Sequence, residues 1–97
     1  MQLLTKAIRK SLPALGAMDG RPACEVPIRV KFFTPWANWT WYATEFDGED
    51  TFFGMVHGHE NELGYFSLSE LESIQGPAGL KIERDRHYSG KSLADVS

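Results

Sequence analysis

Aromatic side chains crowd the middle of this chain, and this crowding constrains the fold more than any other feature. Eleven of the twelve aromatic residues lie between Phe32 and Phe66. Within this stretch Trp41 and Ala43 fall on one side of an extended segment and Tyr42 on the other, which is the alternation of a β-strand. The pattern predicts a β-sheet with large side chains on both faces. We therefore expect the second face to be partly covered, by helices or by a partner.

Turn-forming residues divide this region and its N-terminal flank into four strands. We expect the strands at residues 26–32, 39–46, 51–56 and 63–66. The connections are short, so neighbouring strands should pair antiparallel as a meander. Gly54, inside the third strand, predicts a bulge or a close approach of two backbones.

Two short helices complete the predicted fold. Near the N-terminus Leu4 and Ile8 are spaced for one helical face, and Thr5 is placed to cap that helix. A second helix should follow the fourth strand, where Ser67 and Glu70 form a capping-box sequence. The predicted fold class is therefore α+β: a four-stranded antiparallel meander sheet with an N-terminal helix and a helix after the fourth strand.

The length of 97 residues suits a single domain covering residues 1–97, and the polar residues 89–97 predict a frayed tail. Cys24 is the only cysteine, so no intramolecular disulfide can form. No stretch has the pattern of a signal peptide or a membrane span. These features favour a cytoplasmic protein.

The formal net charge of −3 conceals a strong segregation of charge. Residues 1–31 contain six basic and two acidic side chains, whereas residues 32–80 contain eight acidic side chains and neither Lys nor Arg. Residues 81–97 contain four basic and three acidic side chains. The total disfavours a strongly basic nucleic-acid-binding protein, and the acidic middle favours a partner with a basic surface.

Five stretches of the chain resemble the bacterial domain-of-unknown-function family numbered 2958. They are residues 30–35, 38–45, 52–54, 62–72 and 82–85, and the resemblance covers about residues 3–86. It implies a bacterial cytoplasmic protein of the kind encoded on plasmids, phages or integrative elements. It implies no reaction and carries no catalytic residues.

The leading hypothesis is a non-enzymatic binding module that uses an acidic surface to occupy a basic, nucleic-acid-binding partner. In the mobile-element setting that the resemblance implies, such a protein would be an anti-defence inhibitor, for example an anti-CRISPR protein. The predicted contacts are the acids of two turns and two tryptophans that alternation does not bury together: Asp47, Glu49, Asp50, Glu60, Glu62, Trp36 and Trp39.

Two alternatives stay open. The first is a nucleic-acid-binding accessory protein that uses the basic N-terminal region: Lys6, Arg9, Lys10, Arg29 and Lys31. The second is a metal-dependent enzyme at the turn that carries His57 and His59, although a metal site needs further ligands. The sequence contains no recognisable catalytic motif, and we expect no cofactor.

Overall fold

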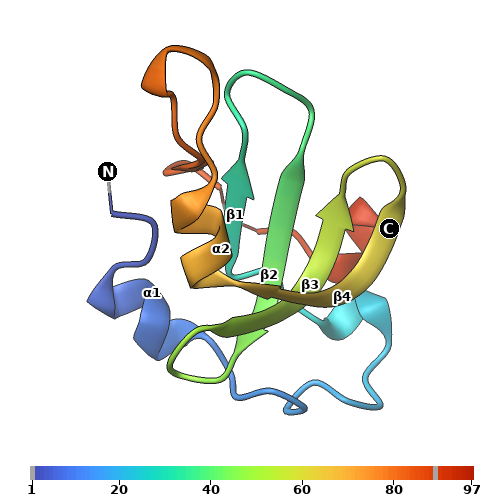
Figure 1. The fold of residues 1–97 in the computed structure, drawn as a ribbon. Coiled ribbons are helices and arrows are strands. Elements are labelled where there is room, and N and C mark those ends of the chain that lie inside the picture. Colours follow the sequence, from blue (N-terminus) through green and yellow to red (C-terminus); the bar gives the residue numbers. More distant parts are fainter. Residues whose placement is uncertain (1, 89) are drawn as a thin grey trace.

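A β-sheet runs through the middle of the molecule, with helices and connecting segments on both sides (Figure 1). The computed structural model describes residues 2–88 and 90–97. Within them the strands are β1 (Val30–Phe33), β2 (Thr40–Phe46), β3 (Thr51–His57), β4 (Asn61–Ser67) and β5 (Glu83–Arg84). The α-helices are α1 (Lys6–Ser11) and α2 (Leu68–Ser73), and the 3₁₀ helices are η1 (Ala23–Glu25), η2 (Pro77–Gly79) and η3 (Leu93–Val96).

The strands lie in the order β4-β3-β2-β1-β5, and all neighbours are antiparallel. The mixed α and β composition and the antiparallel sheet are confirmed, but the sheet has five strands in the described part of the chain rather than four. The added strand, β5, pairs Phe32 with Arg84 and Phe33 with Glu83. Two residues are too few to show a period-2 pattern, so the sequence did not reveal this strand.

The first strand begins at Val30, later than the predicted residue 26. The backbone before it is bound instead to the C-terminal segment. Leu93 N donates to Val26 O at 2.8 Å, and Ile28 N donates to Lys91 O at 3.0 Å. These bonds turn residues 26–28 away from the main sheet.

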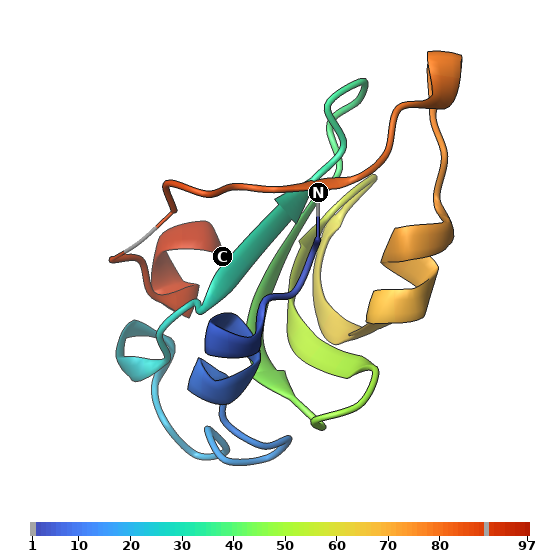
Figure 2. The ribbon, with the colours of Figure 1, turned by 90° about the vertical axis from the view of Figure 1, so that its left-hand side faces the viewer.

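Both helices cover the same face of the sheet and enclose the main core (Figure 2). On that face Phe46, Phe52 and Phe66 stack in a row, with ring centroids 4.5 and 5.2 Å apart. Leucines that flank or belong to the helices close the row: Leu4, Leu12, Leu68 and Leu71. Burying an aromatic side chain of this size contributes about 1.5–3 kcal/mol, so this row accounts for much of the stability.

The helix caps follow the prediction. Thr5 Oγ1 accepts a hydrogen bond from Ile8 N at 3.2 Å, and Ser67 Oγ accepts one from Glu70 N at 3.0 Å. Each bond satisfies a backbone N–H that a helix leaves unpaired in its first turn.

The second face of the sheet is partly covered by the chain itself. Val26 follows η1, and Leu93 lies within η3. Both residues pack on Met55 of β3 and bury it, and Tyr42 packs at the side of this cluster. The described residues 90–97 are therefore docked, not frayed as predicted, because Leu93 is apolar and fills this second cluster. Residue 89 lies outside the described residues.

Gly54 marks a close approach of two strands, one of the two outcomes predicted for it. A Cβ at this position would collide with the carbonyl oxygen of Tyr42 on β2. The irregularity in pairing lies on β2 itself, where the register shifts between Ala43 and Glu45. The extra residue there, Thr44, is buried and donates from Oγ1 to Phe53 O at 3.1 Å.

Candidate functional site

Three of the predicted contact residues meet at one end of the sheet. A pocket of about 420 Å³ is lined by Trp39, Val56, His59, Glu60 and Glu62. The sheet positions its floor, since Val56 on β3 is paired with Glu62 on β4. The turn between the two strands is closed by a hydrogen bond from Gly58 N to the carbonyl oxygen of Glu60 at 3.1 Å.

The wall of this pocket is the indole of Trp39, which is half-buried rather than fully exposed. Its ring stacks on Trp41 at 5.8 Å between centroids and meets His59 edge-on at 5.3 Å. The ring also lies directly against Gly58, where a Cβ would collide with it. The absence of a side chain at Gly58 therefore allows the indole to close over the turn.

The pocket has the chemistry of a cation-binding site. The carboxylates of Glu60 and Glu62 belong to exposed residues, and the half-buried aromatic ring of Trp39 lines the same pocket. No Lys or Arg is among the described residues that line it. An ammonium or guanidinium group is attracted both by an aromatic face and by a carboxylate, so the arrangement suits a Lys or Arg side chain.

Trp36, the other predicted aromatic anchor, is not part of this pocket. It is half-buried and packs against the main core. Its ring covers Gly76, where a Cβ would collide with it. Of the two predicted anchors, Trp39 lines the acidic pocket and Trp36 covers Gly76.

The second acidic turn, between β2 and β3, lies at the opposite end of β3 and has bonds of its own. Asp47 Oδ1 accepts from the backbone N–H groups of Glu49 and Asp50 at 2.8 Å and of Thr51 at 3.0 Å. These hydrogen bonds hold the pKa of the Asp47 carboxyl below its usual value of 3.8. Arg9 approaches the same turn, donating from Nη1 to Gly48 O at 2.8 Å. The two predicted acidic clusters therefore do not form one continuous surface.

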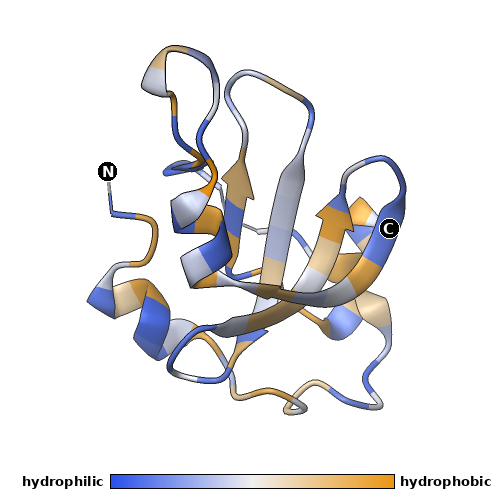
Figure 3. Cartoon of the chain, viewed as in Figure 1, coloured by the Kyte–Doolittle hydropathy of each residue, from blue (hydrophilic) through white to orange (hydrophobic). Residues whose placement is uncertain are grey.

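Strand β4 adds an exposed apolar feature that the sequence did not single out. It lies at the edge of the sheet, where Tyr65 is 70% and Leu63 is 52% exposed. Figure 3 shows the hydrophilic turn between β3 and β4 giving way to an apolar band further along β4. Both side chains are on the face opposite the helices, beyond the cover that η3 provides, since they pair with Phe53 and Met55. Alternation alone could place them on one face, but only the strand order shows that the face is open there.

The two histidines of the metal hypothesis do not come together. His57 Nε2 lies 2.5 Å from the carbonyl oxygen of Val96, and its ring meets Tyr42 edge-on on the second face. His59 packs instead on Trp39 in the turn. Among residues 2–88 and 90–97, no three His, Cys, Asp or Glu side chains are grouped to hold a metal ion. The turn breaks the strand alternation on which the shared site depended.

The basic residues divide between structural and exposed roles. Lys31 Nζ lies 3.6 Å from Asp85 and over the rings of Tyr42 and Tyr88, and Arg9 lies over Phe46. The remaining three of the predicted set are exposed: Lys6, Lys10 and Arg29. Because β5 pairs with β1, Lys31 and Arg84 lie on the side of the sheet opposite β4, the edge strand that carries Glu62.

The protein is an α+β domain with a small antiparallel sheet and the helices α1 and α2 on one face of it. Its pockets are shallow and lie at the surface. The chain belongs to DUF2958, a family of proteins of unknown function, whose model matches residues 3–95. No curated protein and no solved structure matches the chain. In the described part of the chain, none of the helices has the length and apolar character needed to cross a membrane.

Proposed function

We propose that this protein is a non-enzymatic binding module that recognises a basic protein surface through the β4 edge. The observation that carries the proposal is the pocket that unites Trp39 with the carboxylates of Glu60 and Glu62. A Lys or Arg side chain of the partner enters this pocket and is held by the ring and the two acids.

The neighbouring part of β4 adds an apolar feature on the opposite face of the same edge strand. Tyr65 and Leu63 are the two most exposed of the large apolar side chains named among the described residues, and they stand on an edge strand. Aromatic side chains anchor many protein interfaces, whereas acids at the rim steer a basic partner and set its orientation. A partner that binds around the β4 edge would meet the charged pocket on the helix-covered face and this apolar pair on the other face.

The class of partner is a further part of the proposal. A basic surface that normally holds nucleic acid is the natural complement of this acidic edge. The family resemblance adds the setting of a bacterial mobile element, in which such a module would act as an anti-defence, anti-CRISPR-like inhibitor. The cytoplasm is the compartment in which such a partner would be met.

The test is binding to purified nucleic-acid-guided defence complexes, measured with the wild-type protein and two matched double variants. Glu60→Gln with Glu62→Gln removes the acids of the pocket, whereas Glu70→Gln with Glu72→Gln removes two exposed acids of α2. We expect the first pair to weaken binding about tenfold or more and the second less than about twofold. Equal effects of the two pairs, or no binding to any such complex, would contradict the proposal.

A further inference from the structure

Backbone hydrogen bonds join the C-terminal segment to the β1 side of the sheet, and an opening lined by described residues lies between two of them. Asp85 N donates to Lys31 O at 2.9 Å, and further along Ile28 N donates to Lys91 O at 3.0 Å. Two cavities, of about 330 and 710 Å³, lie in this region, and Arg29 lines both. We call this opening the Arg29 groove. It lies at the opposite edge of the sheet from β4.

The smaller cavity is positively charged. It is lined by Arg29, Arg84 and Arg86, and Asp85 is the one carboxylate among the described residues around it. That carboxylate already faces Lys31 Nζ at 3.6 Å. The cavity therefore carries a net positive charge that its own surroundings do not neutralise.

The three arginines have different tasks. Arg84 donates from Nη1 to the carbonyl oxygens of Gln2 and Leu3, at 2.5 and 3.1 Å, and so anchors the N-terminal segment. Arg29 and Arg86 are exposed, and among the described residues neither side chain is held by a hydrogen bond or an ion pair. Their guanidinium groups are thus available to a ligand.

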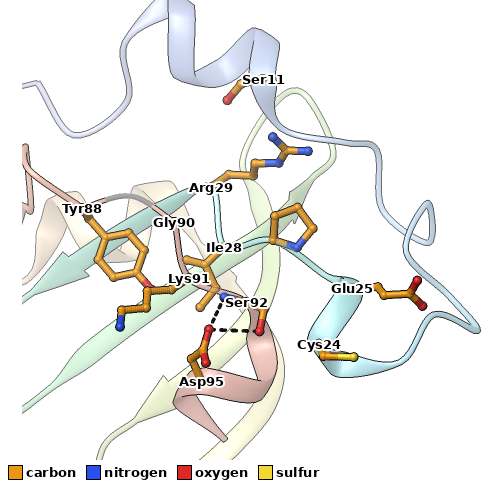
Figure 4. Close-up of a pocket in the computed structure, with 11 residues that line it drawn as sticks. Ser11, Cys24, Glu25, Ile28, Arg29, Tyr88, Gly90, Lys91, Ser92 and Asp95 are labelled. Atoms are coloured by element: carbon orange, nitrogen blue, oxygen red, sulfur yellow. Dashed lines mark hydrogen bonds between the residues drawn. The ribbon is translucent and has the colours of Figure 1, made fainter.

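The larger cavity continues the groove past Tyr88 and Lys91 (Figure 4). Asp95 is the acidic residue of this cavity that lies nearest to Tyr88 and Lys91 (Figure 4). Its carboxylate accepts hydrogen bonds from Ser92 N at 2.7 Å and from Ser92 Oγ at 3.1 Å. Figure 4 shows Glu25 at the far end of the cavity, away from Tyr88. The charged residues of the larger cavity are Arg29 and Lys91 with Glu25 and Asp95, so the excess of positive charge lies in the smaller cavity.

Tyr88 stands where the two cavities meet, because it lines both. Its hydroxyl is buried and has no hydrogen-bond partner within residues 2–88 and 90–97. Burial raises the pKa of this phenol to about 12, so the hydroxyl stays protonated at neutral pH. The junction of the two cavities thus holds a protonated, buried hydroxyl without a hydrogen-bond partner among the described residues.

We propose that the Arg29 groove binds the phosphodiester backbone of nucleic acid, independently of the proposed β4 interface. Guanidinium groups and hydroxyls are the usual partners of phosphate oxygens. Helix α1 borders the cavities through Ile8 and Ser11, whereas Lys6 and Lys10 lie two positions from Ile8, on the other side of the helix. The cations that line the groove are therefore Arg29, Arg84, Arg86 and Lys91. A row of cations suits a chain of phosphates better than one isolated phosphate ion.

The test is fluorescence polarisation with a labelled single-stranded oligonucleotide, repeated with its duplex, and with ATP and inorganic phosphate as competitors. We expect binding at about 50 mM salt that weakens steeply as salt rises. Arg29→Gln, Arg86→Gln and Lys91→Gln should each weaken binding about three- to tenfold and lower the salt slope by about one. These residues are exposed, so circular dichroism should show unchanged folding.

The matched control is Arg21→Gln, which removes one exposed positive charge outside the groove and should change affinity less than about twofold. Glu60→Gln with Glu62→Gln should leave oligonucleotide binding intact, which separates this proposal from the β4 interface. The proposal is overturned if no oligonucleotide binds at low salt. It is equally overturned if Arg21→Gln weakens binding as much as Arg29→Gln, or if inorganic phosphate or ATP competes at the concentration of oligonucleotide phosphate.

Discussion

The carboxylate of Asp50 binds both polar groups of Ser69. Its Oδ1 accepts from Ser69 N at 2.8 Å, and its Oδ2 accepts from Ser69 Oγ at 2.9 Å. The backbone carbonyl of Asp50 also accepts from Leu68 N at 2.8 Å. These bonds join the turn between β2 and β3 to the start of α2, so Asp50, which the sequence analysis predicts as a partner contact, also supports the fold.

Replacing Asp50 with Ala should destabilise the protein, because the first turn of α2 then loses an acceptor for an unpaired backbone N–H. The expected loss is about 1–2 kcal/mol of the free energy of unfolding in a urea titration. Glu49→Ala is the control, since Glu49 is exposed in the same turn, and it should change stability by less than about 0.5 kcal/mol. Equal losses for the two variants would show that the bonds to Ser69 contribute nothing.

A second carboxylate has a similar structural role on the other face of the sheet. Glu45 is 4% exposed, and its two oxygens accept from Gly16 N at 2.9 Å and Met18 N at 2.8 Å. In Glu45→Gln one oxygen becomes an NH₂ group that faces a backbone N–H, so one bond is lost. We expect a loss of about 1–3 kcal/mol in the free energy of unfolding and faster hydrogen exchange at one or both amides. Glu25→Gln, at an exposed acid, should change neither measurement.

These two acids show what the sequence could and could not predict. The caps at Thr5 and Ser67 depend on residues three positions away, so a local pattern reveals them. The partners of Asp50 and Glu45 lie 19 and 29 residues away, and only the packing of turns against helix and loop brings them together.

The candidate site follows the same rule. The charge pattern points to Glu60 and Glu62, and the spacing of aromatic residues points to Trp39. Neither pattern shows that these three residues line one pocket. The exposure of Tyr65 depends on β4 being an edge strand, and β5 on the opposite edge is too short to be read from sequence. Edge positions are a property of the whole sheet and have no local signal.

Gly54→Ala should be strongly destabilising, because a Cβ would collide with the carbonyl oxygen of Tyr42 on the neighbouring strand. The atoms that the Cβ would meet are backbone atoms of β2 and cannot move aside easily, so we expect a loss of about 3 kcal/mol or more in the free energy of unfolding. Gly64 pairs with Gly54 across the sheet, and a Cβ there meets no atom within 4 Å. Gly64→Ala should therefore be nearly neutral in the same denaturation experiment. A strong loss of stability at both glycines would show that the collision with Tyr42 is not the cause.

Gly58→Ala should damage the pocket more than the fold. The added methyl group would collide with the ring of Trp39, which would have to leave its place against His59. We expect a shift in tryptophan fluorescence and partner binding that is weaker by about tenfold, with the melting temperature changed little. Asn38→Ala, at an exposed residue of the preceding loop, is the control and should alter neither signal. Normal partner binding by a folded Gly58→Ala protein would argue against Trp39 as a wall of the binding site.

The ionised carboxylate of Asp47 should stabilise the folded protein at neutral pH but not at strongly acidic pH. Three backbone N–H groups lower the pKa of this carboxyl in the folded state below its ordinary value of 3.8, so the folded protein favours the ionised form. The stabilisation is fully present above the unfolded pKa and is lost as the pH falls through the folded pKa.

Asp47→Asn keeps an oxygen that can accept hydrogen bonds but removes the charge. We therefore expect the variant to be less stable than the wild-type protein at neutral pH, and the difference to close below a pH of about 4. Urea titrations across this range measure the difference, and a gap that stays constant down to the lowest pH would show that the ionised carboxylate is not what the turn requires.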